Sequence, residues 1–166
     1  MIFVGNSDPD GKPWPARLAR AAAYNPAKNT WRRIAPIPDA RGGASAVWDG
    51  RDVLVVGGSP GGTTLLRSAL AYNPATNQWR RLAPMPSGRF GTAAVWTGTR
   101  LLLWDGGGSP DGSAVARRNG FAYDPATNRW ATLPAAPFAA RNTAAVWTGR
   151  SLFVWGGATA AATYTP

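Results

Sequence analysis

The stretch AYNPATNQWRRLAPMP, residues 71–86, decides the fold because the chain repeats it. A first copy begins with YNPAKNTW at Tyr24, and a third begins with YDPATNRW at Tyr123. The three tyrosines are 48 and 51 residues apart, and the tryptophans of the AVW and NxW segments keep the same two intervals. A period of about 50 residues is typical of repeat architectures, in which each unit packs on its neighbours.

Each repeat reads as four short strands joined by turns. The first strand ends in AVW, and an Asp-Gly or Thr-Gly turn leads to the second strand, which reads VLVV, LLLW or LFVW. A glycine pair ends the second strand, the third strand ends at the repeated tyrosine, and Asn-Pro or Asp-Pro starts the next turn. Asn29, Asn77 and Asn128 suit a left-handed position in that turn. The 20 glycines and 15 prolines argue against long helices, so we predict an all-β chain.

The second repeat carries a glycine pair (Gly57 and Gly58), then Tyr72, then Trp79, then Arg89 after a proline-containing loop. This series resembles the kelch repeats, which the central domain of galactose oxidase also contains, and the resemblance covers nearly the whole chain. The resemblance implies a β-propeller of four-stranded blades and a loop face that binds protein partners. The repeated structural residues are Gly57, Gly58, Tyr72, Trp79, Trp96, Gly107, Gly108, Tyr123, Trp130, Trp147, Gly156 and Gly157.

One propeller region fills residues 1–166, with about three blades' worth of strands. We expect the second to fourth strands of a blade in 1–43, complete blades in 44–91 and 92–142, and the first to third strands of another in 143–166. Propellers close with about four to eight blades, and the resemblance implies six or seven. The chain is therefore either part of a larger propeller or a part-propeller that assembles as a homo-oligomer, since its open sheet edges need partners.

Positive charge dominates the composition, with 18 basic and 8 acidic residues and a formal net charge of +10. This balance indicates an acidic partner or an anionic polymer, although a bias of the source genome toward arginine would give the same composition. Nucleic acid is disfavoured because the tryptophans occupy strand positions typical of a core. We see no signal peptide and no apolar run of about 20 residues that could cross a membrane, and the compartment stays open.

Catalytic residue types are scarce, because the chain has no histidine, cysteine or glutamate. Copper radical oxidases of the galactose oxidase type need cysteine and histidine, and sialidases need a glutamate. The segment SDPDGKPW, residues 7–14, resembles a sialidase Asp-box, but its aspartates are displaced, and it lacks the later ligands of a calcium loop. We therefore predict a non-enzyme without cofactor or metal. The alternative is a fragment of a sialidase-like or galactose-oxidase-like enzyme, or of a carbohydrate-binding protein, whose functional residues lie elsewhere.

Arginines recur in the long, variable loops, which we expect on one face of the propeller. Arg41, Arg89 and Arg141 take matching places before the first strands, and Arg67, Arg117 and Arg118 lie in the loops between second and third strands. Because arginine binds carboxylates bidentately, we predict that these six residues bind a protein or another acidic ligand. The alternative for Arg41, Arg89 and Arg141 is structural: each packs between blades and donates to backbone carbonyls.

The paired charges Arg80 and Arg81 fall on the outermost strand, where charge discourages stray edge pairing. On the same strand, Trp79 and Leu82 are an odd number of residues apart. A regular strand points such residues to opposite faces, so a β-bulge is needed if both belong to one core.

Overall fold

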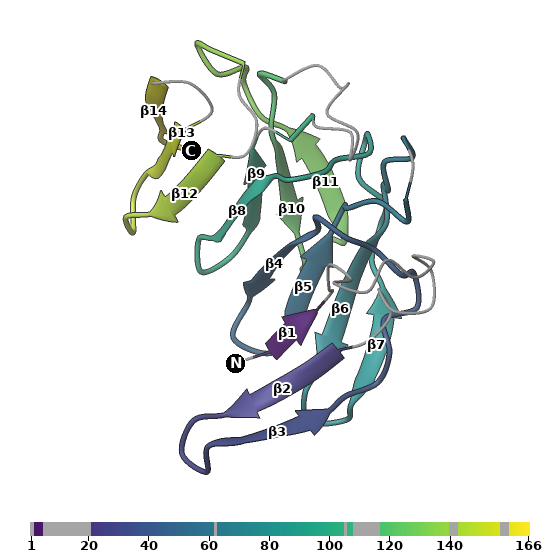
Figure 1. The fold of residues 1–166 in the computed structure, drawn as a ribbon. Helices are drawn as coiled ribbons and strands as arrows, with labels where there is room; N and C mark the ends of the chain where they lie inside the picture. The colour runs from purple at the N-terminus through teal and green to yellow at the C-terminus, as the bar shows by residue number, and fades with distance from the viewer. Residues whose placement is uncertain are drawn as a thin grey trace.

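A computed structural model describes residues 2–4, 21–61, 63–104, 106–107, 117–139, 143–156 and 160–166. These residues form strands and turns without a helix, and the strands build four antiparallel sheets (Figure 1). The first sheet contains β1 (Ile2–Val4), β2 (Ala21–Asn25) and β3 (Thr30–Arg33). The second contains β4 (Ser45–Trp48), β5 (Val53–Val56), β6 (Ala69–Asn73) and β7 (Gln78–Arg81).

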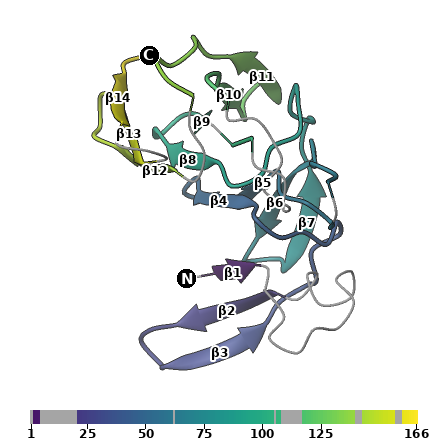
Figure 2. The same cartoon turned by 45° about the horizontal axis from the view of Figure 1, so that its top comes forward.

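The third sheet repeats this order with β8 (Ala93–Trp96), β9 (Leu101–Trp104), β10 (Phe121–Asp124) and β11 (Arg129–Thr132). The fourth contains β12 (Thr143–Trp147), β13 (Leu152–Gly156) and β14 (Ala160–Tyr164). Every sheet is a meander whose strands pair in chain order. The sheets follow one another along an open arc (Figure 2), and β8 packs between β4 and β12. The predicted all-β part-propeller of four-stranded blades is thus confirmed.

The sheets pack face to face, and each strand in the middle of a sheet is apolar on both sides. Leu54 and Val56 of β5 belong to the core shared with the third sheet, whereas Val53 and Val55 belong to the core shared with the first. All four residues of β5 are buried, which explains why the segment reads as a continuous apolar run.

The described part of the chain contains no helix that could span a membrane.

Trp79 and Leu82 point to opposite faces of the second sheet, and no bulge separates them. Trp79 packs in the core shared with the first sheet, and Leu82 in the core shared with the third. The antiparallel register continues without interruption, because the Leu82 amide donates to the Ala69 carbonyl at 2.9 Å. The bulge is therefore unnecessary: the two residues belong to two cores.

A repeated tyrosine, asparagine and tryptophan join the second sheet to the first and the third sheet to the second. Asn77 has the expected left-handed backbone, with φ 56°, and its Oδ1 accepts the Tyr72 hydroxyl at 2.8 Å and the Ala35 amide at 3.0 Å. Trp79 Nε1 returns a bond to the Ala35 carbonyl at 2.8 Å. The third sheet repeats these bonds with Tyr123, Asn128 and Trp130 on Ala83. The tryptophans therefore join sheets through polar as well as apolar contacts.

Candidate functional site

The loops before the first strands are hydrogen-bonded to the loop between the second and third strands of the second sheet. Gly42, before β4, exchanges two backbone bonds with Ser59, after β5, each 2.9 Å long. Gly58 then donates to the carbonyl of Arg89, in the loop before β8, at 2.7 Å. We call this surface the loop face; its described residues are 35–44, 57–61, 63–68, 83–92, 117–120 and 133–139.

The glycine pair after β5 makes room for these contacts. Gly57 and Gly58 have φ +67° and +90°, which side chains rarely adopt. A Cβ on Gly57 would lie 2.6 Å from the Arg89 carbonyl oxygen, and one on Gly58 would lie 2.7 Å from that of Gly42. In the third sheet Gly106, which the sequence analysis left out, replaces Gly58: its Cβ would lie 3.0 Å from the Phe90 carbonyl oxygen.

Of the remaining glycines of the sequence pattern, some lie within the residues that the structure describes and some lie outside them. Gly107 is buried, and Gly156 ends β13 with φ 112°. Gly108 and Gly157 lie outside the described residues.

Arg41 is buried at the base of the loop face, with a side-chain exposure of 0%. Its Nε donates to the Asp39 carbonyl at 2.8 Å, and its Nη1 donates to the Gly57 and Ser68 carbonyls at 3.0 and 3.1 Å. Its Nη2 reaches the Ser68 hydroxyl and the Asp39 carboxylate. Burial lowers the pKa of Arg41 to about 10, against the opposing effect of Asp39, so the guanidinium stays charged at neutral pH.

Arg89 takes the equivalent place in front of the third sheet and is 1% exposed. Its Nη1 donates to the Gly106 carbonyl at 3.5 Å and its Nη2 to Asn119 Oδ1 at 3.1 Å, while its Cζ lies 4.6 Å from the centre of the Phe121 ring. Arg41 and Arg89 thus each tie the incoming loop to the loop between the second and third strands of the same sheet. This is the arrangement of the structural alternative, and it leaves no guanidinium surface for a ligand.

In contrast to the buried Arg41 and Arg89, both Arg67 and Arg118 are exposed. Arg67 Nε donates to the Met85 carbonyl at 2.7 Å, and Arg118 Nε donates to the Ala136 carbonyl at 2.8 Å. In each sheet the backbone adds a second bond, from Met85 N to Arg67 O at 2.8 Å and from Ala136 N to Arg118 O at 2.6 Å. Among the described residues the Nη groups of both arginines have no partner. Each guanidinium is thus fixed at one edge and open at the other.

The two other predicted ligand-binding arginines are Arg117, which the structure describes, and Arg141, which it does not. Arg117 is exposed and lines a small cavity of about 70 Å³ between the third and fourth sheets, beside Trp104, Phe138 and Tyr164. Arg141 lies outside the described residues. The structure therefore brings Arg67, Arg117 and Arg118 to the surface of the loop face.

The outer-strand arginines have ion-pair partners that the sequence pattern did not reveal. Arg81 binds both carboxylate oxygens of Asp39 at 2.7 Å, which joins the second sheet to the preceding loop. The Arg81 hydrogen bonds lower the pKa of Asp39, and burial opposes them. Arg80 binds Asp52 at 2.8 Å, and the second oxygen of this buried carboxylate has no hydrogen-bond partner among the described residues.

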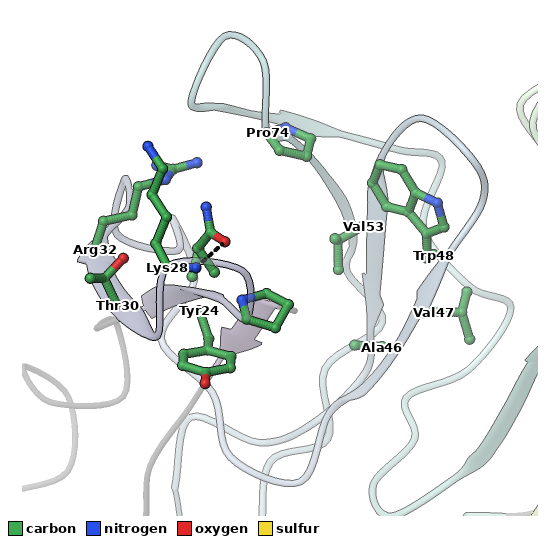
Figure 3. A pocket seen from close by; sticks show the side chains of 12 residues that line it. Tyr24, Lys28, Thr30, Arg32, Ala46, Val47, Trp48, Val53 and Pro74 are labelled. Atoms are coloured by element: carbon green, nitrogen blue, oxygen red, sulfur yellow. Dashed lines mark hydrogen bonds between the residues drawn. The ribbon is translucent and has the colours of Figure 1, made fainter.

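A cleft of about 870 Å³ lies between the first and second sheets (Figure 3). Trp48 and Val53 line one side, and Lys28 and Arg32 line the other. Trp48 is 51% exposed, because β4 has no inner strand of a preceding sheet against it among the described strands. The sequence analysis missed this cleft, although the order of strands in the first sheet could have indicated it.

Metal-binding groups are not gathered anywhere in the described part of the chain. No three side chains of the histidine, cysteine, aspartate and glutamate types lie close enough together there to hold an ion.

A comparison with protein families matches residues 40–86 to the Kelch motif. The matched segment begins beside Arg41 and includes the glycine pair, Tyr72 and Trp79, whose contacts join the loops and sheets described above. A comparison with curated proteins gave no match. The matched segment is one of the copies that the chain repeats, so residues 40–86 form a kelch repeat within an open series of antiparallel β-sheets.

Proposed function

We propose that the chain is a non-catalytic binding scaffold whose loop face takes a carboxylate-bearing segment of a partner protein. Kelch repeats commonly bind proteins, which gives the class of function. The observation that carries the proposal is the equivalent placement of Arg67 and Arg118 in neighbouring sheets, each held by Nε with its Nη groups exposed.

The surroundings of the two arginines favour a peptide over a small ion. Exposed prolines stand on both sides of their carbonyl partners: Pro84 and Pro86 around Met85, and Pro134 and Pro137 around Ala136. A partner segment with acidic side chains would meet apolar surface as well as charge. Because each Nε is already held, less side-chain freedom is lost when the exposed Nη pair binds a carboxylate.

The outward faces of the first and fourth sheets belong to the same proposal. Trp31 and Trp155, one on each of these sheets, are 60% and 43% exposed. Further kelch blades would cover these faces, and they would come from a second copy or from the rest of a larger propeller.

The competing explanation for any acidic ligand is general attraction to a chain of net charge +10. The two explanations differ in what happens when equal charge is removed from different places. Arg51 and Arg129 are exposed arginines outside the loop face, so the double variant Arg51→Ala/Arg129→Ala is the matched control for Arg67→Ala/Arg118→Ala.

The probe is a short fluorescein-labelled peptide of alternating glutamate and leucine, with its glutamine counterpart as a reference, and the measurement is fluorescence anisotropy at physiological salt. We expect Arg67→Ala/Arg118→Ala to weaken binding by about tenfold or more, since hydrogen bonds to charged groups contribute about 1.5 to 3 kcal/mol each. The control should weaken it by less than about threefold. Equal losses would establish general charge attraction instead, and equal affinity for the glutamine peptide would exclude carboxylate recognition.

A further inference from the structure

Three of the four large apolar side chains that are exposed among the described residues lie on the first and fourth sheets, at positions that are covered elsewhere in the chain. Trp31 is 60% exposed, Val146 46% and Trp155 43%. Trp79 and Trp130, the counterparts of Trp31, pack against a preceding sheet and are only partly exposed. Trp31, Val146 and Trp155 are thus exposed because no further sheet covers them among the described residues.

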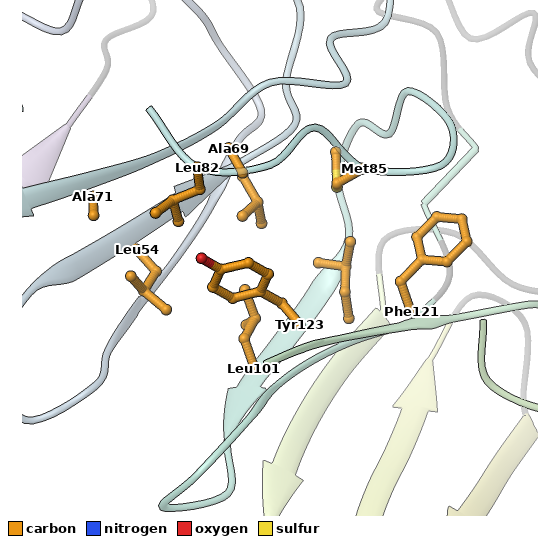
Figure 4. Packing of buried hydrophobic residues seen from close by; sticks show 10 residues of the cluster. Leu54, Ala69, Ala71, Leu82, Met85, Leu101, Phe121 and Tyr123 are labelled. Atoms are coloured by element: carbon orange, nitrogen blue, oxygen red, sulfur yellow. The ribbon is translucent and has the colours of Figure 1, made fainter. Parts of the chain in front are cut away.

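Every contact between sheets within the chain joins two different kinds of face. We call a face forward when it points to the next sheet and backward when it points to the preceding one. Between the second and third sheets, the forward residues Leu54 and Ala71 meet the backward residues Leu101 and Tyr123, and the Tyr123 ring points toward Leu54 (Figure 4). The third and fourth sheets meet in the same way. Forward faces therefore fit backward faces, three times in succession.

Among the described residues, the two faces without a neighbouring sheet are one of each kind. The fourth sheet exposes its forward face, with Val146, Phe153 and Trp155, since Leu152 and Val154 face the third sheet. On the first sheet, Trp31 is exposed on the backward face beside the half-buried Tyr24, since Ala21 and Ala23 face the second sheet. The chain thus carries both halves of the contact that it already makes between its own sheets.

The backward face already has the side-chain geometry of its covered counterparts. The Tyr24 and Trp31 rings are 5.0 Å apart at 42°, against 5.1 Å at 47° for Tyr72 and Trp79. On the forward face, Phe153 and Trp155 form a ring pair 5.5 Å apart. Aromatic side chains that are ordered before they meet a partner lose little further freedom on binding.

We infer that a second copy of the chain packs head to tail, with the forward face of one copy against the backward face of the next. The inference rests on the covering of terminal sheets in the proposed function and is independent of the loop-face arginines. The contact is heterologous, because the two faces differ. Since it is apolar and joins chains of net charge +10, added salt strengthens it by screening repulsion, whereas salt weakens an acidic ligand on the loop face.

The experiment is sedimentation velocity of the whole chain over a range of concentrations, at low and at high salt. We expect the wild-type chain to associate, more strongly at high salt. Trp31→Asp removes the backward face and Trp155→Asp the forward face, so each variant alone should weaken association by about tenfold or more, as loss of a buried aromatic anchor does. Trp48→Asp, at an exposed tryptophan outside both faces, is the matched control and should associate like the wild type.

Mixing the two variants tests the direction of the contact. Trp155→Asp keeps an intact backward face and Trp31→Asp an intact forward face, so an equimolar mixture should form one-to-one dimers that grow no further. Dimers of either variant alone that are as tight as those of the mixture would establish a like-with-like contact and overturn the inference, as would a wild-type chain that stays monomeric at every concentration. A mixture that stays monomeric while the wild type associates would also overturn it.

Folding of the variants is checked by far-UV circular dichroism, and Val146→Asp provides a second, smaller change on the forward face. A folded Val146→Asp chain that associates like the wild type would contradict the assignment of that face. Peptide binding by the monomeric Trp31→Asp chain keeps the loop-face proposal separate, because its result depends only on Arg67 and Arg118.

Discussion

Two pairs of arginines on the loop face differ in almost everything except their residue type. Arg41 and Arg89 are 1% exposed, and each is bonded to a carbonyl after a second strand. Arg67 and Arg118 are exposed, and each is bonded through Nε alone to a carbonyl of a proline-rich loop. Both pairs have one member in the second and one in the third sheet, so recurrence by itself does not separate a structural arginine from one available to a ligand.

The difference follows from what each arginine meets in the loops. Where loops converge, they bring backbone carbonyls inward and few apolar side chains, so a planar group with five N–H donors satisfies acceptors that no apolar residue could. Arg41 supplies such a group to Asp39, Gly57 and Ser68. Arg67 lies at the rim, where solvent satisfies the Nη groups. The buried pair thus forms a small polar core beneath the loop face, and the exposed pair lies on its surface.

The largest effect is expected from truncating the buried pair. Arg41→Ala would remove the guanidinium donor from the Gly57 carbonyl, leave the Ser68 carbonyl with only the Gly57 amide, and leave Asp39 without one of its cations. We therefore expect a loss of about 3 to 5 kcal/mol in the free energy of unfolding. Arg67→Ala should cost only about 1 kcal/mol, since it removes one hydrogen bond, from Nε to the Met85 carbonyl, and the exposed end of the side chain loses nothing. Urea unfolding followed by tryptophan fluorescence measures both, and equal losses would remove the distinction between the pairs.

Gly57→Ala tests the same polar core from the opposite side and should cost less than Arg41→Ala. The new Cβ would lie 2.6 Å from the Arg89 carbonyl oxygen, at a residue with φ +67°. We expect a loss of about 2 to 4 kcal/mol, because the left-handed backbone and the backbone clash both contribute. Gly98→Ala is the matched control: φ is +101°, but no atom lies within 4 Å of its Cβ position. A loss at Gly98 as large as that at Gly57 would show that backbone conformation alone requires the glycine.

Much of this fold could be predicted from the sequence because its determinants are local and recur. The turn after each third strand needs a left-handed residue, and Asn29, Asn77 and Asn128 provide it with φ 48°, 56° and 54°. Alternation and turn residues likewise predict which segments are strands. The odd spacing of Trp79 and Leu82 predicts a bulge only if both side chains belong to one core. A sheet that lies between two others contributes to two cores, and these two residues belong to one each.

The burial of individual loop residues could not be predicted in the same way. Arg41 and Arg67 both lie in polar, proline- or glycine-rich segments. Arg41 is bonded to residues 16 and 27 positions away, and Arg67 to a residue 18 positions away, and these contacts decide which of the two is buried. The partner of Arg81 is still more remote, since Asp39 precedes it by 42 residues and belongs to another loop. Such pairings follow from how neighbouring sheets pack, which a single repeat does not encode.

The smallest effect is expected at the ion pair of Asp39 and Arg81, which braces the loop above Arg41. The Arg81 hydrogen bonds lower the pKa of Asp39 in the folded chain below its ordinary value of 3.8. The stabilisation is therefore present above about pH 4 and is lost as the pH falls through the lowered pKa. Thermal unfolding between about pH 5 and pH 2.5 should show a shallower acid decline for Asp39→Asn than for the wild type.

Asp124→Asn is the matched control, because the nearest cation to Asp124 is Arg100, at 3.9 Å. The control should keep the wild-type acid decline, since an exposed pair at that distance contributes little. The same decline in the wild type and in Asp39→Asn would mean that Arg81 does not hold the carboxylate in solution. Arg41 would then be braced only by the carbonyls beneath the loop face, and Asp39→Asn would leave the cost of Arg41→Ala unchanged.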